Sequence, residues 1–98
     1  MSVKVLINRM VPRNKSLEMV KLFREMRALA TAQSGYISGE TMKSNDQPDS
    51  FLVISTWESA DDWEKWLLSK DRQVIQEKID TLLGGKTTYE MFHYGFKE

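Results

Sequence analysis

The sequence predicts an α+β domain of the ferredoxin-like kind, in which the order βαββαβ builds a four-stranded antiparallel sheet with both helices on one face. Three observations lead to this prediction. The chain has 98 residues, which is enough for one hydrophobic core. Four segments carry strand patterns, and two stretches with a helical period each follow a strand. We therefore expect residues 1–98 to form a single domain.

The first half of the chain predicts a strand, a helix and an edge strand. Residues 2–10 alternate as a strand does, and both of the resulting faces are largely apolar. From about Ser16 the apolar residues recur at helical spacing, until Gly35 offers the left-handed conformation that commonly stops a helix. Residues 36–43 then read as a strand that is polar enough to lie at a sheet edge.

The second half begins with a hairpin. Residues 44–49, SNDQPD, are rich in turn formers and should join two antiparallel strands. The strand expected at residues 50–57 is apolar on both sides, because Phe51, Val53 and Trp57 point one way while Leu52 and Ile54 point the other. Both sides of this strand therefore need to be covered.

A capped helix is expected to follow directly. Ser59 and Asp62 have the spacing of a capping box, and Trp63 and Trp66 lie three residues apart on one helical face. Residues 69–71 can restart or kink the helix, which leaves open whether the helical region is one piece or two. Gly84 and Gly85 should end it, and residues 86–96 alternate as a last strand.

Two helices can cover only one face of such a sheet. The other face would expose an apolar patch larger than monomers normally tolerate. If a second copy of the chain covered six such side chains, the gross gain would be about 10 kcal/mol before association entropy is subtracted. We therefore expect a homodimer that forms through the sheets, and Arg9, which points away from the face of Asn8, is a candidate for a dimer contact.

Composition excludes several classes of function. Basic and acidic residues balance at 14 each, so the chain has no positive field that would attract nucleic acid. No cysteine and a single histidine are present, which makes a protein metal site improbable. No apolar run approaches the length of a membrane span, and the N-terminus is too polar for a signal peptide. We expect a soluble, cytoplasmic protein.

Short motifs spread over nearly the whole chain resemble the antibiotic biosynthesis monooxygenase (ABM) family of dimeric α/β barrels. They are Asn8-Arg9 at the end of the first strand, the strand ending Thr56-Trp57-Glu58-Ser59, and Trp66-Leu67-x-Ser69. The resemblance implies a dimer in which two sheets pack face to face, with a ligand cavity between helices and sheet in each subunit.

One branch of this family degrades heme with an asparagine, a tryptophan and a histidine. Asn8 and Trp66 match the first two positions, but Gln76 stands at the third, and an amide is a poor substitute for the imidazole that binds heme iron. Other members are cofactor-independent monooxygenases of hydroxylated aromatics or quinols, in which the substrate itself supplies electrons to O₂. This second activity is the one that we expect here.

The resemblance implies Asn8 and Trp66 as catalytic residues, with the amide of Asn8 hydrogen-bonding the aromatic oxygen and Trp66 forming an apolar wall. No metal or cofactor is expected. The candidates for substrate binding are Leu6, Phe23, Met26, Trp63, Gln76 and His93. Two alternatives stay open: a non-catalytic dimer that binds a small apolar molecule, and a heme degrader with altered iron ligation.

Overall fold

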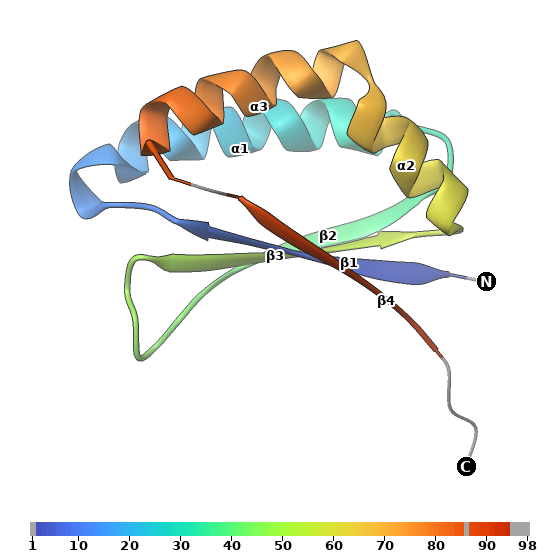
Figure 1. Cartoon of the computed structure of the whole chain (residues 1–98), viewed down its shortest axis with the longest axis horizontal. Coiled ribbons are helices and arrows are strands. Elements are labelled where there is room, and N and C mark those ends of the chain that lie inside the picture. The colour runs from blue at the N-terminus through green and yellow to red at the C-terminus, as the bar shows by residue number, and fades with distance from the viewer. Residues whose placement is uncertain (1, 86, 95–98) are drawn as a thin grey trace.

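The structure, a computed structural model that describes residues 2–85 and 87–94, has the predicted order of elements. The strands are β1 (Val3–Met10), β2 (Tyr36–Lys43), β3 (Ser50–Trp57) and β4 (Thr88–His93), and a 3₁₀ turn at Arg13–Lys15 precedes the first helix. The helices are α1 (Ser16–Thr31), α2 (Ala60–Leu68) and α3 (Lys70–Leu83). All three helices lie over the same face of the sheet (Figure 1). This arrangement is the ferredoxin-like fold.

The sheet is antiparallel throughout, in the order β2-β3-β1-β4. Its register assigns each central residue to one face, because directly paired residues point the same way. Ile7 pairs with Val53 on one side and Tyr89 on the other, beneath the helices. Leu6 pairs with Ile54 on the opposite side, which we call the open face. The prediction that β3 is apolar on both sides is confirmed.

The loop from α1 to β2 differs slightly from the sequence prediction. The helix ends at Thr31, four residues before the glycine that was expected to stop it. Gly35 nevertheless has a φ of +86°, and its carbonyl accepts a hydrogen bond of 2.7 Å from the amide of Glu58. The left-handed glycine therefore turns the chain into β2 and ties it to the end of β3, while two i−3 hydrogen bonds finish the helix.

The capped and divided second helical region is confirmed. The hydroxyl of Ser59 accepts a hydrogen bond from the amide of Asp62 at 3.1 Å. Ser69 ends α2 with extended backbone and begins α3, where its hydroxyl accepts from the amide of Arg72 at 3.2 Å. Gly84 stops α3 with a φ of +63°.

The hairpin at residues 44–49 is also confirmed, with the amide of Ser44 bonded to the carbonyl of Ser50 at 3.0 Å. The last strand is shorter than predicted, because β4 covers Thr88–His93. Of the rest of the predicted strand, Thr87 and Tyr94 lie outside β4, and residues 86, 95 and 96 lie outside the described residues. No helix in the described part of the chain is long and apolar enough to cross a membrane.

The core fills the space between the helices and the sheet. One cluster gathers around Trp57 at the end of β3, against the two tryptophans of α2. A second cluster lies at the other end, where Met19 of α1 packs with Ile75 and Ile79 of α3. Between these clusters, the middle of the sheet is covered by a mixture of apolar and charged side chains, and the candidate site lies there.

Candidate functional site

A small cavity of about 60 Å³ lies between the helices and the sheet, where a ligand site was expected. This volume admits a few water molecules and is well below the roughly 300 Å³ of a small ligand pocket. Most of the lining is apolar or aromatic, with three arginines among it. The lining residues are Ile7, Arg9, Phe23, Met26, Arg27, Ala30, Tyr36, Gly39, Thr41, Val53, Ser55 and Arg72.

Two of the lining arginines are buried. Arg9 on β1 and Arg72 in the first turn of α3 each expose only 4% of their surface. Arg9 occupies the next helix-facing position of β1 after Ile7, because alternate residues of a strand share a face. Arg72 shares one side of α3 with Ile75 and Ile79, which are both core residues. Each guanidinium thus stands at a position that the local pattern assigns to the core.

The protein acceptors of these two guanidinium groups are neutral among the described residues. Nη2 of Arg9 donates to Oε1 of Gln76 at 3.0 Å, and its Nε donates to the hydroxyl of Thr87 at 3.3 Å. Nη2 of Arg72 donates to the same Gln76 oxygen at 3.4 Å and to the phenol oxygen of Tyr89. Two cations therefore converge on one amide oxygen.

Within residues 2–85 and 87–94, one carboxylate is hydrogen-bonded to this network, and the bond is made through Gln76. The Nε2 group of Gln76 donates to Oδ1 of the exposed Asp80 at 2.8 Å and to the hydroxyl of Thr87 at 3.0 Å. These bonds fix the amide so that its oxygen faces the arginines. Asp80 also attracts the charge of Arg9 from a distance.

The pKa of Arg9 is lowered to about 10, mainly by burial and also by the neighbouring charge of Arg72, whereas Tyr89 and Asp80 act in the opposite direction. At neutral pH, Arg9 therefore remains positively charged. Its guanidinium lies 5.5 Å from the ring centre of Phe23, and that of Arg72 lies 5.8 Å from Trp63 and 5.1 Å from Tyr89. Aromatic faces thus provide part of the compensation that carboxylates usually give.

An aromatic cluster forms the wall next to this charge. Trp57 stacks on Trp66 with ring centres 6.4 Å apart, and it meets Trp63 at 6.0 Å and Tyr36 at 5.4 Å edge to face. Of these rings, Tyr36 lines the cavity directly. The indole N–H of Trp57 is satisfied by the hydroxyl of Ser55 at 2.7 Å. The three tryptophans are almost completely buried, so close packing holds the cluster in place.

The cavity approaches the surface between α1 and β2. There, Nη2 of Arg27 donates to the hydroxyl of Thr41 at 3.2 Å, and both residues are exposed. A groove of about 230 Å³ adjoins this hydrogen bond on the outside, and it shares Phe23, Arg27 and Thr41 with the cavity lining. The cavity and a larger apolar groove therefore lie on either side of the same three side chains.

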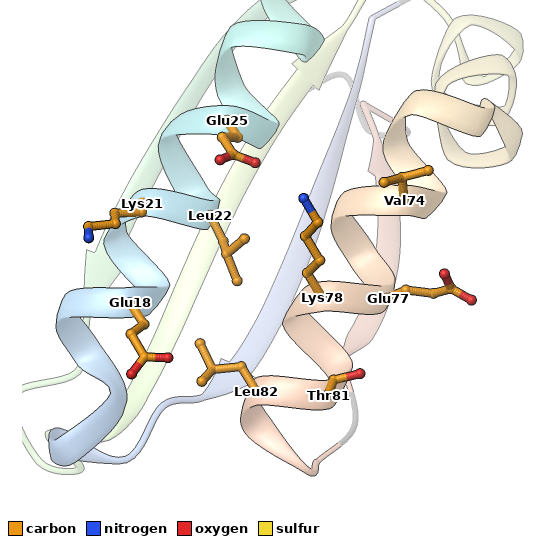
Figure 2. Close-up of a pocket in the computed structure, with 9 residues that line it drawn as sticks. All are labelled: Glu18, Lys21, Leu22, Glu25, Val74, Glu77, Lys78, Thr81 and Leu82. Carbon is orange, nitrogen blue, oxygen red and sulfur yellow. The ribbon is translucent and has the colours of Figure 1, made fainter.

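A wider groove of about 830 Å³ runs between α1 and α3 on the outer surface. Figure 2 shows Leu22 and Leu82 pointing toward one another between the helices, with Lys78 reaching into the same gap. Acidic and basic side chains alternate around these leucines. Their charges are solvated, and none of the buried polar groups described above contributes to this groove. We therefore place the candidate site beneath the helices.

The structure brings together only part of the predicted site. Phe23 and Met26 line the cavity, and Trp63 and Gln76 contact the arginines that line it. Trp66 lies behind Trp57 in the core, where it is 3% exposed. The substrate-binding and catalytic roles of these residues stay predictions.

The other candidates lie elsewhere. Leu6 and Asn8 belong to the open face and do not line the cavity. His93 is exposed at the end of β4, opposite Val3. The expectation that Arg9 serves a dimer contact is wrong, because this side chain is enclosed beneath the helices. Asn8 therefore lies on the opposite side of the sheet from the predicted residues that line the cavity.

Sequence reasoning missed the two buried arginines. A signal was available for each, because each interrupts an apolar period: Arg9 follows Val5 and Ile7 at a spacing of two, and Arg72 precedes Ile75 at a spacing of three. A charged residue on a core-facing position points to a functional or structural role, since burying a charge is costly.

A family model described as antibiotic biosynthesis monooxygenase matches residues 2–78. Comparison with the curated proteins finds no match. Three solved structures are similar over nearly their whole length, and at these sequence identities the likeness concerns the fold. SnoaB from Streptomyces nogalater, a cofactor-independent oxygenase, has a TM-score of 0.78 at 16% identity, covering 99% of this chain and 97% of that chain. Rv0793 from Mycobacterium tuberculosis has a TM-score of 0.84 at 14% identity, with coverage of 99% and 98%. A conserved protein from Methanosarcina mazei Go1 has a TM-score of 0.86 at 14% identity, with coverage of 94% and 91%.

Proposed function

Because the chain belongs to the antibiotic biosynthesis monooxygenase family, we propose that it oxidises a small phenolic, quinol-like or polyketide aromatic substrate with O₂ and without a cofactor. The similar fold of SnoaB, a cofactor-independent oxygenase, supports the cofactor-free form of this reaction. The cavity between helices and sheet is the proposed reaction site.

The observation that carries the proposal is the combination of an apolar, partly aromatic cavity with buried positive charge. Aromatic and aliphatic side chains suit the faces of a ring. The guanidinium groups of Arg9 and Arg72 lower the pKa of a bound phenol, because nearby cations favour its ionised form. No histidine, aspartate or glutamate is among the described residues that line the cavity, so electrostatic stabilisation replaces a strong base in this scheme.

The reaction balances with the substrate as the only reductant. A phenolate transfers an electron to O₂ more readily than a phenol does, and recombination of the two radicals forms a carbon–oxygen bond on the ring. Loss of water from the resulting peroxide leaves a quinone. One oxygen atom of O₂ enters the product, the other leaves as water, and the substrate supplies all four electrons.

The homodimer belongs to the same proposal. The open face carries apolar side chains on all four strands, and three of them are about half exposed in the single chain: Met10 (50%), Met42 (50%) and Phe92 (46%). Covering such a patch with a twofold-related copy removes it from water without any further element. Asn8 would then lie at the interface between the two sheets.

Oxygen uptake tests the proposed activity. Purified protein is incubated aerobically with a panel of dihydroxy-aromatics, and O₂ consumption and quinone formation are followed. We expect saturable uptake that falls at least tenfold in Arg72→Gln, because the phenolate loses a cation, and that is unchanged in Arg13→Gln, an exposed arginine outside the cavity. Equal uptake by the two variants would refute a role for the buried charge in turnover.

The predicted catalytic pair needs its own test. If Asn8→Ala and Trp66→Phe both leave oxidation rates unchanged while the protein stays folded, the assignment of these two residues is wrong. The small volume of the cavity favours one alternative function, a non-catalytic protein that binds a small apolar molecule. Tight binding of a panel compound without any oxygen uptake would support that alternative.

A further inference from the structure

We propose that the cavity recognises the carboxylate of an aromatic acid, which Arg9 and Arg72 bind together. This inference rests on the proposed function for the location of the site, and it adds a charged group to the class of substrate. The argument uses the burial of the two arginines, the arrangement of their donors and the shape of the space in front of them.

The burial of the two charges is unexplained by the single chain. Both side chains are 4% exposed, and their hydrogen-bond acceptors in the described part of the chain are an amide, a hydroxyl and a phenol. Buried charges are ordinarily paired with an opposite charge. Arg72 is also placed unfavourably in the first turn of α3, where the helix dipole prefers an anion. A bound anion would relieve both costs.

The donors are arranged for an oxygen ligand. Both guanidinium groups already reach one oxygen, Oε1 of Gln76, at 3.0 and 3.4 Å. Their hydrogen bonds in the described residues use Nε and Nη2 of Arg9 but only Nη2 of Arg72. Among the described residues no fully buried side-chain nitrogen lacks a partner, so the donors of Arg72 without a protein acceptor keep some accessible surface. A carboxylate fits such donors, because its two oxygens match the planar fork of an arginine.

The space favours a small planar head group attached to a ring. The inner cavity of about 60 Å³ accommodates the carboxylate, with apolar side chains of β1, β3 and α1 around it. The ring would extend toward the outer groove of about 230 Å³, which shares Phe23, Arg27 and Thr41 with the cavity lining and lies beside the hydrogen bond between Arg27 and Thr41. Phe23 lines both spaces and offers a ring face to the ligand.

Binding of benzoate tests the proposal without any turnover. Under anaerobic conditions in a low-salt buffer, the thermal midpoint and the tryptophan fluorescence of the full chain are measured against benzoate, benzamide, phenyl phosphate and inorganic phosphate. We expect benzoate to raise the midpoint and to bind at least tenfold more tightly than benzamide, which has the same shape without the charge. Arg9→Gln and Arg72→Gln should each weaken benzoate binding at least tenfold, whereas Arg13→Gln should leave it unchanged.

The comparison of benzoate with benzamide on the unaltered protein keeps the test valid even if an arginine variant does not fold. Equal binding of the two compounds, or no saturation by benzoate at 10 mM, overturns the proposal. Phenyl phosphate binding more tightly than benzoate, or inorganic phosphate matching it, overturns the choice of an aromatic carboxylate. Oxygen uptake with uncharged quinols and no preference for benzoate would leave the proposed function intact while refuting this inference, and benzoate binding without uptake would do the reverse.

Discussion

At the scale of single residues, Arg9 and Arg72 determine the chemistry of the cavity. Each stands where the local pattern calls for an apolar side chain. In a purely structural protein, a methionine or leucine at either position would give a more stable folded state. The two charges come from elements that are distant in sequence, yet they share one acceptor on Gln76. Their retention beneath the helices is best understood as stability exchanged for the ability to hold an anion.

Replacing Arg9 by methionine should stabilise the protein at pH 7. Burial lowers the pKa of Arg9 to about 10, and this shift from the ordinary value corresponds to about 3 kcal/mol against the charged form in the folded protein. Loss of the hydrogen bonds to Gln76 and Thr87 offsets part of this, so we expect Arg9→Met to raise the free energy of unfolding by about 1–2 kcal/mol. Chemical denaturation of both proteins at pH 7 measures the difference.

The same difference should depend on pH in a defined direction. Because the pKa of Arg9 is lower in the folded than in the unfolded chain, the cost of its charge is fully present below pH 10. Between about pH 10 and 12 the unfolded chain binds more protons than the folded one. The free energy of unfolding of the unaltered protein should therefore rise toward that of Arg9→Met over this range. This account would be contradicted if the difference in free energy of unfolding between the two proteins stayed constant up to pH 11.5, or if Arg9→Met were the less stable protein at pH 7.

At the scale of elements, the connection between α2 and α3 couples stability to the site. Ser69 ends one helix and caps the next, and the amide that it caps belongs to Arg72. Ser59 caps α2 in the same way, by accepting a hydrogen bond from the amide of Asp62. Unlike Arg72, Asp62 does not line the cavity. The two serines therefore form a matched pair for experiment.

We expect Ser69→Ala and Ser59→Ala each to lower the free energy of unfolding by about 1 kcal/mol, because each removes one cap. Only Ser69→Ala should also weaken benzoate binding several-fold, since the first turn of α3 positions Arg72. Thermal unfolding and fluorescence titration of both variants measure these effects. Equal benzoate affinity in both variants would show that the cap does not position the arginine.

A second pair of variants tests the left-handed glycines that follow α1 and α3. Gly84 has a φ of +63° with nothing within 4 Å of an added Cβ, so Gly84→Ala should cost only the left-handed conformation, about 1–2 kcal/mol. Gly35 has a φ of +86°, and a Cβ there would lie 2.2 Å from Oδ2 of Asp62. Because Asp62 is also the capping partner of Ser59, we expect Gly35→Ala to cost at least about twice as much. Urea unfolding of both variants measures the two losses in free energy of unfolding. Equal losses would show that Asp62 moves aside without cost.

At the scale of the whole molecule, the helices cover one face of the sheet and leave the other open (Figure 1). The open face is apolar along its centre, where Leu6 on β1 pairs with Ile54 on β3. The proposed dimer depends on this face, whereas the proposed carboxylate site lies on the other side of the sheet. Disruption of the dimer and disruption of ligand binding are therefore separable.

Ile54→Glu should convert the dimer into a monomer at micromolar concentration, because it places a charge in the centre of the proposed interface. Leu68→Glu, on an exposed leucine of α2, is the control and should leave the dimer intact. Sedimentation velocity distinguishes the two species. A stable, folded monomer of the unaltered protein at the same concentration would refute the dimer.

The sequence by itself determined the elements and their faces. Several features depend only on residues two to four positions apart, and they can therefore be predicted from the sequence. They are the alternation in β1 and β3, the capping serine before α2 and the paired tryptophans. For the same reason the two-sided apolar character of the central strands could be predicted.

Tertiary structure alone decided the composition of the site. The sequence predicts Leu6, Asn8 and Phe23 in one site, but the pleat places Leu6 and Asn8 on the open face, whereas Phe23 lines the cavity on the other side of the sheet. Arg9 and Arg72 stand 63 positions apart, and no local rule reveals that α3 folds back over the end of β1 so that both reach Gln76. The energy and the role of a buried charge depend on the groups around it. These groups come from segments that meet only when the helices pack on the sheet.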